Sequence, residues 1–175
     1  MDINPKHNIS SKQAIDLINE GLPLVDSYVN GDIIIDNNNW NKEIIIDNCI
    51  IEYFGGGVTQ FKKPIKFTNT HFKNCQFIFS HFPKGLIIKN CRFDKYLDFQ
   101  AGGHNQIGYP IEIKNNIFLD FVNFCDCWYN GEIIISDNKF LKGTNIESQT
   151  QYLTFDVTPQ IRNNTGQTNI EAEFV

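Results

Sequence analysis

An eight-residue pattern recurs along this chain of 175 residues and constrains its fold more than any other feature. The pattern reads apolar, any, apolar, any, Asn, any, any, large apolar. Alternating apolar residues at the first and third positions are typical of a β-strand, and Asn at the fifth suits a turn because it tolerates a left-handed backbone. The five clear copies are Ile44–Ile51, Ile65–Phe72, Leu86–Phe93, Ile111–Phe118 and Ile133–Phe140. We interpret Ile33–Trp40 as an earlier copy and Pro159–Gly166 as a degraded last one.

The spacing of the copies indicates how they are arranged. The five clear copies start 21, 21, 25 and 22 residues apart. A period of about 20 to 50 residues is typical of a solenoid, but paired-helix repeats need about 33 residues or more. Leucine-rich repeats need leucine, whereas this chain has 26 Ile and 8 Leu. The pattern therefore predicts a β-solenoid in which equivalent positions of successive coils stack about 4.8 Å apart.

Stacking gives each position of the pattern a structural role. The fifth-position asparagines are expected to form a ladder of hydrogen bonds between coils: Asn48, Asn69, Asn90 and Asn115. The aromatic residues at the eighth position are expected to fill the interior: Phe72, Phe93, Phe118 and Phe140. The sixth position holds mostly small residues, so the thiols of Cys49 and Cys91 are predicted to pack there and not to bind metal.

The stretch from residue 70 to residue 95 has a stricter, five-residue spacing. Phe72, Phe77 and Phe82 lie five residues apart, each two residues after a small side chain. The units Thr70–Asn74, Cys75–Phe79, Ser80–Lys84 and Cys91–Lys95 resemble the pentapeptide-repeat family and, more broadly, right-handed parallel β-helix proteins. The resemblance implies square coils of four units. We therefore expect an all-β, right-handed parallel β-helix of roughly six coils, each of about 21–25 residues, over residues 31–175.

The two ends of the chain break the pattern. Residues 1–30 are predicted to form an N-terminal segment with a helix at about residues 11–20, because Ser10 and Gln13 form a capping box and Gly21 stops the helix. Solenoids need caps, so we expect this helix to cover the first coil; a partner-binding helix is the alternative. Thr168–Val175 shows no helical pattern, so the last coil is expected to present an unpaired edge and to form a homodimer.

Composition limits the classes of partner and compartment. A net charge of −5 and a pI near 5.3 argue against nucleic-acid binding. No apolar run reaches the roughly 18 residues of a membrane helix, and no signal-peptide layout is seen, so a cytoplasmic protein is expected. An odd count of five cysteines favours free thiols.

The longest interruption between intact copies is Ala101–Tyr109, which stretches one coil to 25 residues. Insertions in solenoids often lie on the binding face. The predicted binding residues are His104, Asn105, Tyr109, Trp128, Tyr129 and Asp98.

Other combinations of residues carry less chemistry. Asp98, Asp120 and Asp126 lie on neighbouring coils, and a glycosidase needs two carboxyls about 5 to 9.5 Å apart, but Asp98 aligns with Asn123 and not with an acid. Cys125 and Cys127 lack the second cysteine pair common in zinc sites. No catalytic residue, metal or cofactor is predicted.

Three functions fit these observations. The favoured one is a non-enzymatic scaffold whose flat faces bind another protein. The second is a carbohydrate-binding or carbohydrate-cleaving β-helix that uses the loop around His104. The third follows from the resemblance alone: some pentapeptide-repeat proteins imitate DNA and bind type II topoisomerases through an acidic face.

Overall fold

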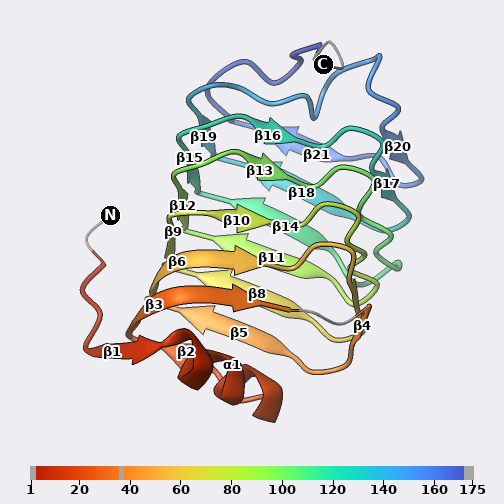
Figure 1. Cartoon of the computed structure of the whole chain (residues 1–175). Helices are drawn as coiled ribbons and strands as arrows, with labels where there is room; N and C mark the ends of the chain where they lie inside the picture. The colour runs from red at the N-terminus through yellow and green to blue at the C-terminus, as the bar shows by residue number, and fades with distance from the viewer. Residues whose placement is uncertain (1–2, 36–37, 172–175) are drawn as a thin grey trace.

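The computed structural model describes residues 3–35 and 38–171 and forms a parallel β-solenoid of about six turns with a single short helix (Figure 1). Two long sheets form its rear and left walls in that view. The rear wall contains, in order, β2 (Leu24–Val25), β5 (Ile44–Asp47), β8 (Ile65–Thr68), β11 (Leu86–Lys89), β14 (Ile111–Lys114), β18 (Ile133–Ser136) and β21 (Gln160–Arg162). The left wall contains β1 (His7–Ser10), β3 (Ser27–Ile34), β6 (Ile50–Gly55), β9 (His71–Phe72), β12 (Arg92–Phe93), β15 (Ile117–Phe118) and β19 (Lys139–Phe140).

Shorter strands complete the four-sided coil. The front wall holds β10 (Cys75–Gln76), β13 (Leu97–Asp98) and β16 (Val122–Asn123). The right wall holds β4 (Asn39–Trp40), β7 (Gln60–Phe61), β17 (Trp128–Tyr129) and β20 (Thr154–Phe155). In Figure 1 the strands in front run from left to right and those behind run back as the chain climbs, which is the sense of a right-handed coil.

The strand register confirms the five clear copies of the pattern. Ile44, Ile65, Leu86, Ile111 and Ile133 are direct partners along the rear wall. The last copy is also confirmed, because β21 within Pro159–Gly166 pairs with β18.

The reading of Ile33–Trp40 as the first copy was wrong. Ile33 pairs with Phe54 of β6, whereas Leu24 of β2 pairs with Ile46 of β5. The first copy is therefore residues 22–29, where Asp26 takes the place of the asparagine. The run of isoleucines at 33–35 imitated the pattern because every strand of a solenoid alternates apolar residues.

The fifth-position residues form the turn that the sequence predicted. Asn48, Asn69, Asn90 and Asn115 have φ values of 51°, 50°, 55° and 57°, in the left-handed region. Their side-chain ladder is less uniform than expected: Asn90 Nδ2 donates to Asn69 Oδ1 at 3.2 Å, but Asn69 and Asn48 donate to aspartates. The column is therefore a turn first and an amide ladder second.

A second asparagine ladder lies at the sixth position, inside the coil. Asn116 Nδ2 donates to Asn138 Oδ1, and Asn138 Nδ2 donates to Asn164 Oδ1, both at 3.0 Å. Asn116 and Asn138 are buried, as are Cys49 and Cys91 at the same position of earlier coils. The sequence predicted packing at this position but not the change from thiols to hydrogen-bonded amides.

The interior is a column of aromatic rings, as predicted from the eighth position. Phe72, Phe93, Phe118 and Phe140 are buried and stack with ring centroids 5.0, 5.1 and 4.9 Å apart. Each ring lies nearly parallel to the next, the offset geometry that aromatic pairs favour.

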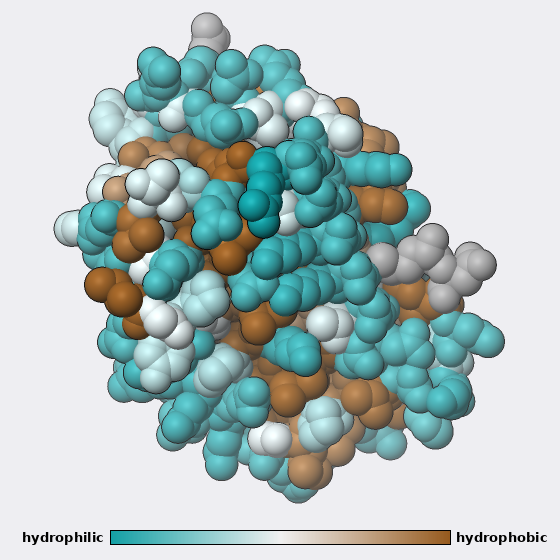
Figure 2. All heavy atoms as spheres, turned by 180° about the vertical axis from the view of Figure 1, so that it is seen from behind, coloured by the Kyte–Doolittle hydropathy of each residue, from teal (hydrophilic) through white to brown (hydrophobic). Residues whose placement is uncertain are grey.

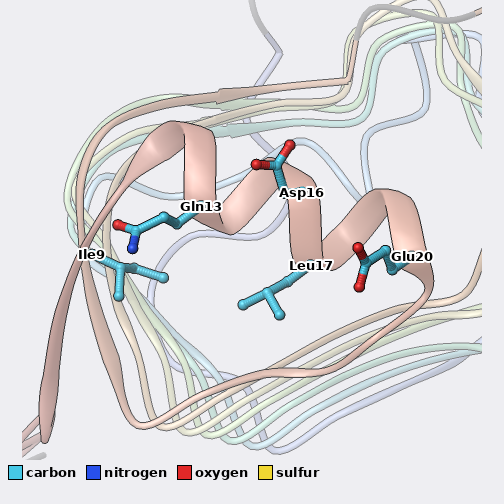
Figure 3. A pocket seen from close by; sticks show the side chains of 5 residues that line it. All are labelled: Ile9, Gln13, Asp16, Leu17 and Glu20. Carbon is cyan, nitrogen blue, oxygen red and sulfur yellow. The ribbon is translucent and has the colours of Figure 1, made fainter.

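Helix α1 (Ser11–Glu20) lies across the N-terminal opening of the coil (Figure 3). Ser10 and Gln13 form the predicted capping box, and Gly21 ends the helix with φ 74°. Ala14 and Ile18 are buried against the first coil. The expected boundary at residue 30 falls inside β3, and β1 pairs with β3, so the N-terminal segment shares the left wall with the coils.

Candidate functional site

The right wall carries an outward-facing column of rings, formed by His81, His104 and Trp128. Gln60, His81, Gly103 and Trp128 pair in sequence as partners in four successive coils. Three of these positions point side chains away from the core, and Gly103 has none to offer. We call His81, His104 and Trp128 the histidine–tryptophan column.

His104 joins the column because Gly103 and His104 depart from the regular coil. His104 follows Gly103 as Phe82 follows His81 and Tyr129 follows Trp128, and those two aromatic side chains are buried. His104 instead has φ 55°, in the left-handed region. A Cβ atom at Gly103 would clash with the carbonyl oxygen of Trp128. The left-handed histidine after a glycine therefore places its ring in the gap between the neighbouring coils.

The rings lie close enough to act as one surface. The ring centroids of His81 and His104 are 4.1 Å apart, and those of His104 and Trp128 are 5.9 Å apart. Trp128 is 45% exposed, yet its Nε1 donates to Asp156 Oδ1 at 3.0 Å. Asn130 Nδ2 holds the other carboxylate oxygen of Asp156 at 2.8 Å. The indole is thus exposed and held in one orientation.

Partial burial affects the charge of both histidines. Loss of solvation lowers the pKa of His81, and the neighbouring His104 lowers it further. Loss of solvation also lowers the pKa of His104. Both rings are therefore neutral at pH 7, and the column presents an aromatic, uncharged surface.

A pocket of about 210 Å³ lies at the corner where the right wall meets the rear wall. Its lining is formed by Lys62, Lys63, Pro64, Lys84 and Tyr109. We call it the lysine pocket. Lys84 Nζ lies 4.1 Å from the centroid of the Tyr109 ring, a cation–π contact.

A larger, shallow hollow of about 310 Å³ lies beside α1 (Figure 3). Ile9 and Leu17 contribute its apolar surface, and Gln13, Asp16 and Glu20 its polar part. The hollow follows from placing one helix across a wider coil, because the helix does not fill the whole opening.

The six predicted binding residues separate into two groups. His104 and Trp128 lie in the histidine–tryptophan column, and Tyr109 lies in the lysine pocket. Tyr129 is 2% exposed and stacks on Phe155 with centroids 5.5 Å apart.

Asn105 and Asp98 also make contacts within the solenoid. Asn105 is fully buried, and its Nδ2 donates to the carbonyl oxygens of Tyr109 and Glu132. Asp98 is 8% exposed, and its Oδ1 accepts hydrogen bonds from Asn123 Nδ2 at 3.0 Å and from the Gln100 N–H at 2.9 Å. These side chains shape the coil on which the exposed rings lie.

The insertion in the long coil is shorter than the sequence suggested. Ala101 has φ 51°, close to the 56° of Phe79 at the equivalent corner, and Gly103 pairs with His81. The extra residues form a turn closed by the Tyr109 N–H donating to the Gln106 carbonyl oxygen at 3.0 Å. The turn brings Tyr109 beneath Lys84.

Carboxylates on the rear and left walls are paired with basic side chains. Glu112 contacts Lys89 and Lys114 at 2.7 and 3.0 Å on the rear wall. On the left wall, Glu52 contacts Lys73 at 2.7 Å. From behind, Figure 2 shows hydrophilic and hydrophobic residues mixed over the surface. Acidic charge is therefore interrupted by basic charge on both walls.

The five cysteines are free and buried. Burial raises the pKa of Cys49 to about 11 and the pKa values of Cys91 and Cys127 to about 12. Within residues 3–35 and 38–171, no group of three or more His, Cys, Asp or Glu side chains is arranged to hold a metal ion.

Sequence reasoning missed His81 and the three lysines of the pocket. His81 belongs to a regular five-residue unit, so its outward position looked ordinary until Gly103 and His104 were placed beside it. The adjacent Lys62 and Lys63 were a usable signal, because two lysines at the end of a strand point to a charged corner.

Comparison with known proteins found no matching family model, no similar curated protein and no matching solved structure. None of the helical residues that the structure describes belongs to a helix long and apolar enough to cross a membrane.

Proposed function

We propose that this protein is a non-enzymatic β-solenoid scaffold that binds another protein through its right wall. The observation that carries the proposal is the half-exposed indole of Trp128, held by Asp156 beside the rings of His104 and His81. Tryptophan is enriched among the residues that dominate binding energy at protein interfaces. An indole already fixed by a hydrogen bond loses little conformational entropy on binding.

The carboxylates considered for catalysis support a non-enzymatic role. Asp98 is buried and hydrogen-bonded within the coil, and Asp120 contacts Lys142 at 3.0 Å. A pair of carboxyls acting on a glycosidic bond must be free to protonate and to attack or activate water. These two side chains instead stabilise the solenoid.

The buried free thiols support a reducing compartment, and we propose a cytoplasmic location. The four-sided coil and the spacing of Phe72, Phe77 and Phe82 support a place in the pentapeptide-repeat family, which we also propose.

Affinity purification with a matched pair of variants tests the partner proposal. Trp128→Ala removes the exposed indole, and Leu141→Ala removes an apolar side chain that is 61% exposed after β19 on the left wall. We expect a partner captured by the natural chain to be lost at least tenfold with Trp128→Ala and kept with Leu141→Ala. Equal recovery with both variants would exclude the right wall as the interface.

A carbohydrate ligand is the second candidate, because an exposed indole face and neutral imidazoles also suit stacking on sugar rings. A glycan array with the natural chain and Trp128→Ala separates the two ideas. Saturable glycan binding that disappears in the variant would favour the sugar, and its absence would leave the protein partner.

Two further proposals concern acidic mimicry and self-association. The pairing of Glu112 and Glu52 with lysines gives little support to topoisomerase binding through a continuous acidic face, and unchanged DNA supercoiling by gyrase in the presence of the protein would reject it. A homodimer through the C-terminal coil is supported by β20 and β21, which are the last strands of their sheets in the described part. Light scattering that gives a monomer at high concentration would reject the dimer.

A further inference from the structure

We propose that the lysine pocket is a binding site for a dianionic phosphate group. It lies beyond the histidine–tryptophan column and does not depend on the proposed protein partner. Three ammonium groups converge on one pocket in a chain whose net charge is −5. Such a local reversal of charge attracts a compact anion.

The three lysines are available because no carboxylate neutralises them. Seven of the 15 basic side chains form ion pairs with acids elsewhere in the part of the chain that the structure describes. Lys62, Lys63 and Lys84 are not among them, within residues 3–35 and 38–171. The nearby Glu132 carboxylate accepts the N–H of Gly108 at 3.0 Å.

The pocket is built by the fold and does not depend on chance positions of surface lysines. Lys62 follows β7, and its N–H donates to the Trp40 carbonyl oxygen at 2.7 Å. Lys84 Nζ is held over the Tyr109 ring and donates to Gln106 Oε1 at 2.9 Å. The corner of one coil and the inserted turn of the next therefore hold the charges together.

The choice of lysine indicates which anion fits. Arginine presents a planar fork that matches a carboxylate, whereas lysine binds phosphate as a point charge with three donors. The chain has two arginines: Arg92 lies on the left wall and Arg162 on the rear wall. Several point charges around one pocket favour a compact group of high charge over a single carboxylate.

Titration of the isotopically labelled full chain with inorganic phosphate tests this site by NMR. We expect saturable shifts at Lys62, Lys63, Lys84 and Tyr109, with affinity for acetate at least about tenfold weaker. The double variant Lys62→Gln, Lys84→Gln is expected to reduce phosphate affinity by about tenfold or more. Lys139→Gln on the left wall removes one charge outside the pocket and is expected to change affinity less than twofold.

Two arms identify the source of the phosphate. Tighter binding of glucose 6-phosphate than of a phosphoserine peptide indicates a small phosphorylated ligand, and the reverse order indicates a phosphorylated segment of a partner. Either result supports the site. Shifts spread over many lysines, equal affinity for acetate, or equal losses in the double variant and in Lys139→Gln would overturn the proposal, provided that the double variant keeps the natural pattern of amide signals.

Discussion

At the residue scale, asparagine has two different roles at adjacent positions of the repeat. At the fifth position it adopts the left-handed turn, and Asn115 there is exposed with φ 57°. At the sixth position Asn116 and Asn138 are buried in an amide ladder. The two roles predict different costs of mutation, because a buried polar group left without a partner is far more costly than an exposed one.

Asn138→Ala is expected to lower the free energy of unfolding by about 3 kcal/mol, since it removes several buried hydrogen bonds at once. Asn138 Nδ2 donates to the Ile113 carbonyl oxygen at 2.8 Å, and its Oδ1 accepts from the Asn116 N–H at 2.9 Å. Asn115→Gly keeps a left-handed turn and is expected to cost less than about 1 kcal/mol. Urea unfolding of both variants measures the difference, and similar losses would contradict the assigned roles.

The stacked histidines predict a dependence of stability on pH. The pKa values of His81 and His104 are lowered in the folded chain, mainly by burial. Unfolding restores the ordinary value, so the unfolded chain binds protons first and the folded chain loses stability as pH falls below about 6.5. We expect a loss of roughly 0.5 kcal/mol between pH 7.5 and 5.5, allowing for partial solvent exposure.

His104→Gln should reduce this acid-induced loss, whereas His7→Gln at an exposed position should leave it unchanged. Carboxylates do not complicate this window. Burial alone would raise the pKa of Asp94, but hydrogen bonds from Arg92 and His71 outweigh it and lower the pKa. Its contribution is therefore lost only below the ordinary pKa of about 4. An identical loss in the natural chain and His104→Gln would refute the argument.

At the element scale, the strands and α1 could be predicted because each depends on local chemistry. The alternation of apolar residues gave β5, β8, β11, β14 and β18, and the capping box with Gly21 gave α1. The first copy of the pattern could not be found in this way, because Asp26 replaces the asparagine. Only the pairing of β2 with β5 distinguishes it from the run of isoleucines at 33–35.

Ser10→Ala is expected to lower the free energy of unfolding by about 1 kcal/mol through loss of the helix cap. Ser10 Oγ accepts the N–H of Gln13 at 3.3 Å, and the Gln13 side chain accepts the Ser10 N–H at 3.0 Å. Ser11→Ala, one residue later, is expected to change stability by less than about 0.5 kcal/mol. Hydrogen exchange should show faster opening of α1 in Ser10→Ala, and equal protection in both variants would argue against the cap.

At the scale of the whole molecule, stacking decides which residues can act together. His81, His104 and Trp128 are more than 20 residues apart at their extremes, yet their rings form one surface because each occupies the same wall. The sequence indicated the region of His104 and Trp128, since the pattern is interrupted there. It did not indicate His81 or the lysine pocket, because both depend on the register of neighbouring coils.

The central claim is that the right wall is the face that binds a partner. A photo-crosslinking residue, p-benzoylphenylalanine, placed at Gln60 tests it directly, because this exposed side chain lies in line with His81 in the column. The same residue at Leu141 on the left wall is the matched control. We predict a discrete crosslinked product from position 60, lost with Trp128→Ala, and none from position 141. A product from position 141 with none from position 60 would contradict the claim.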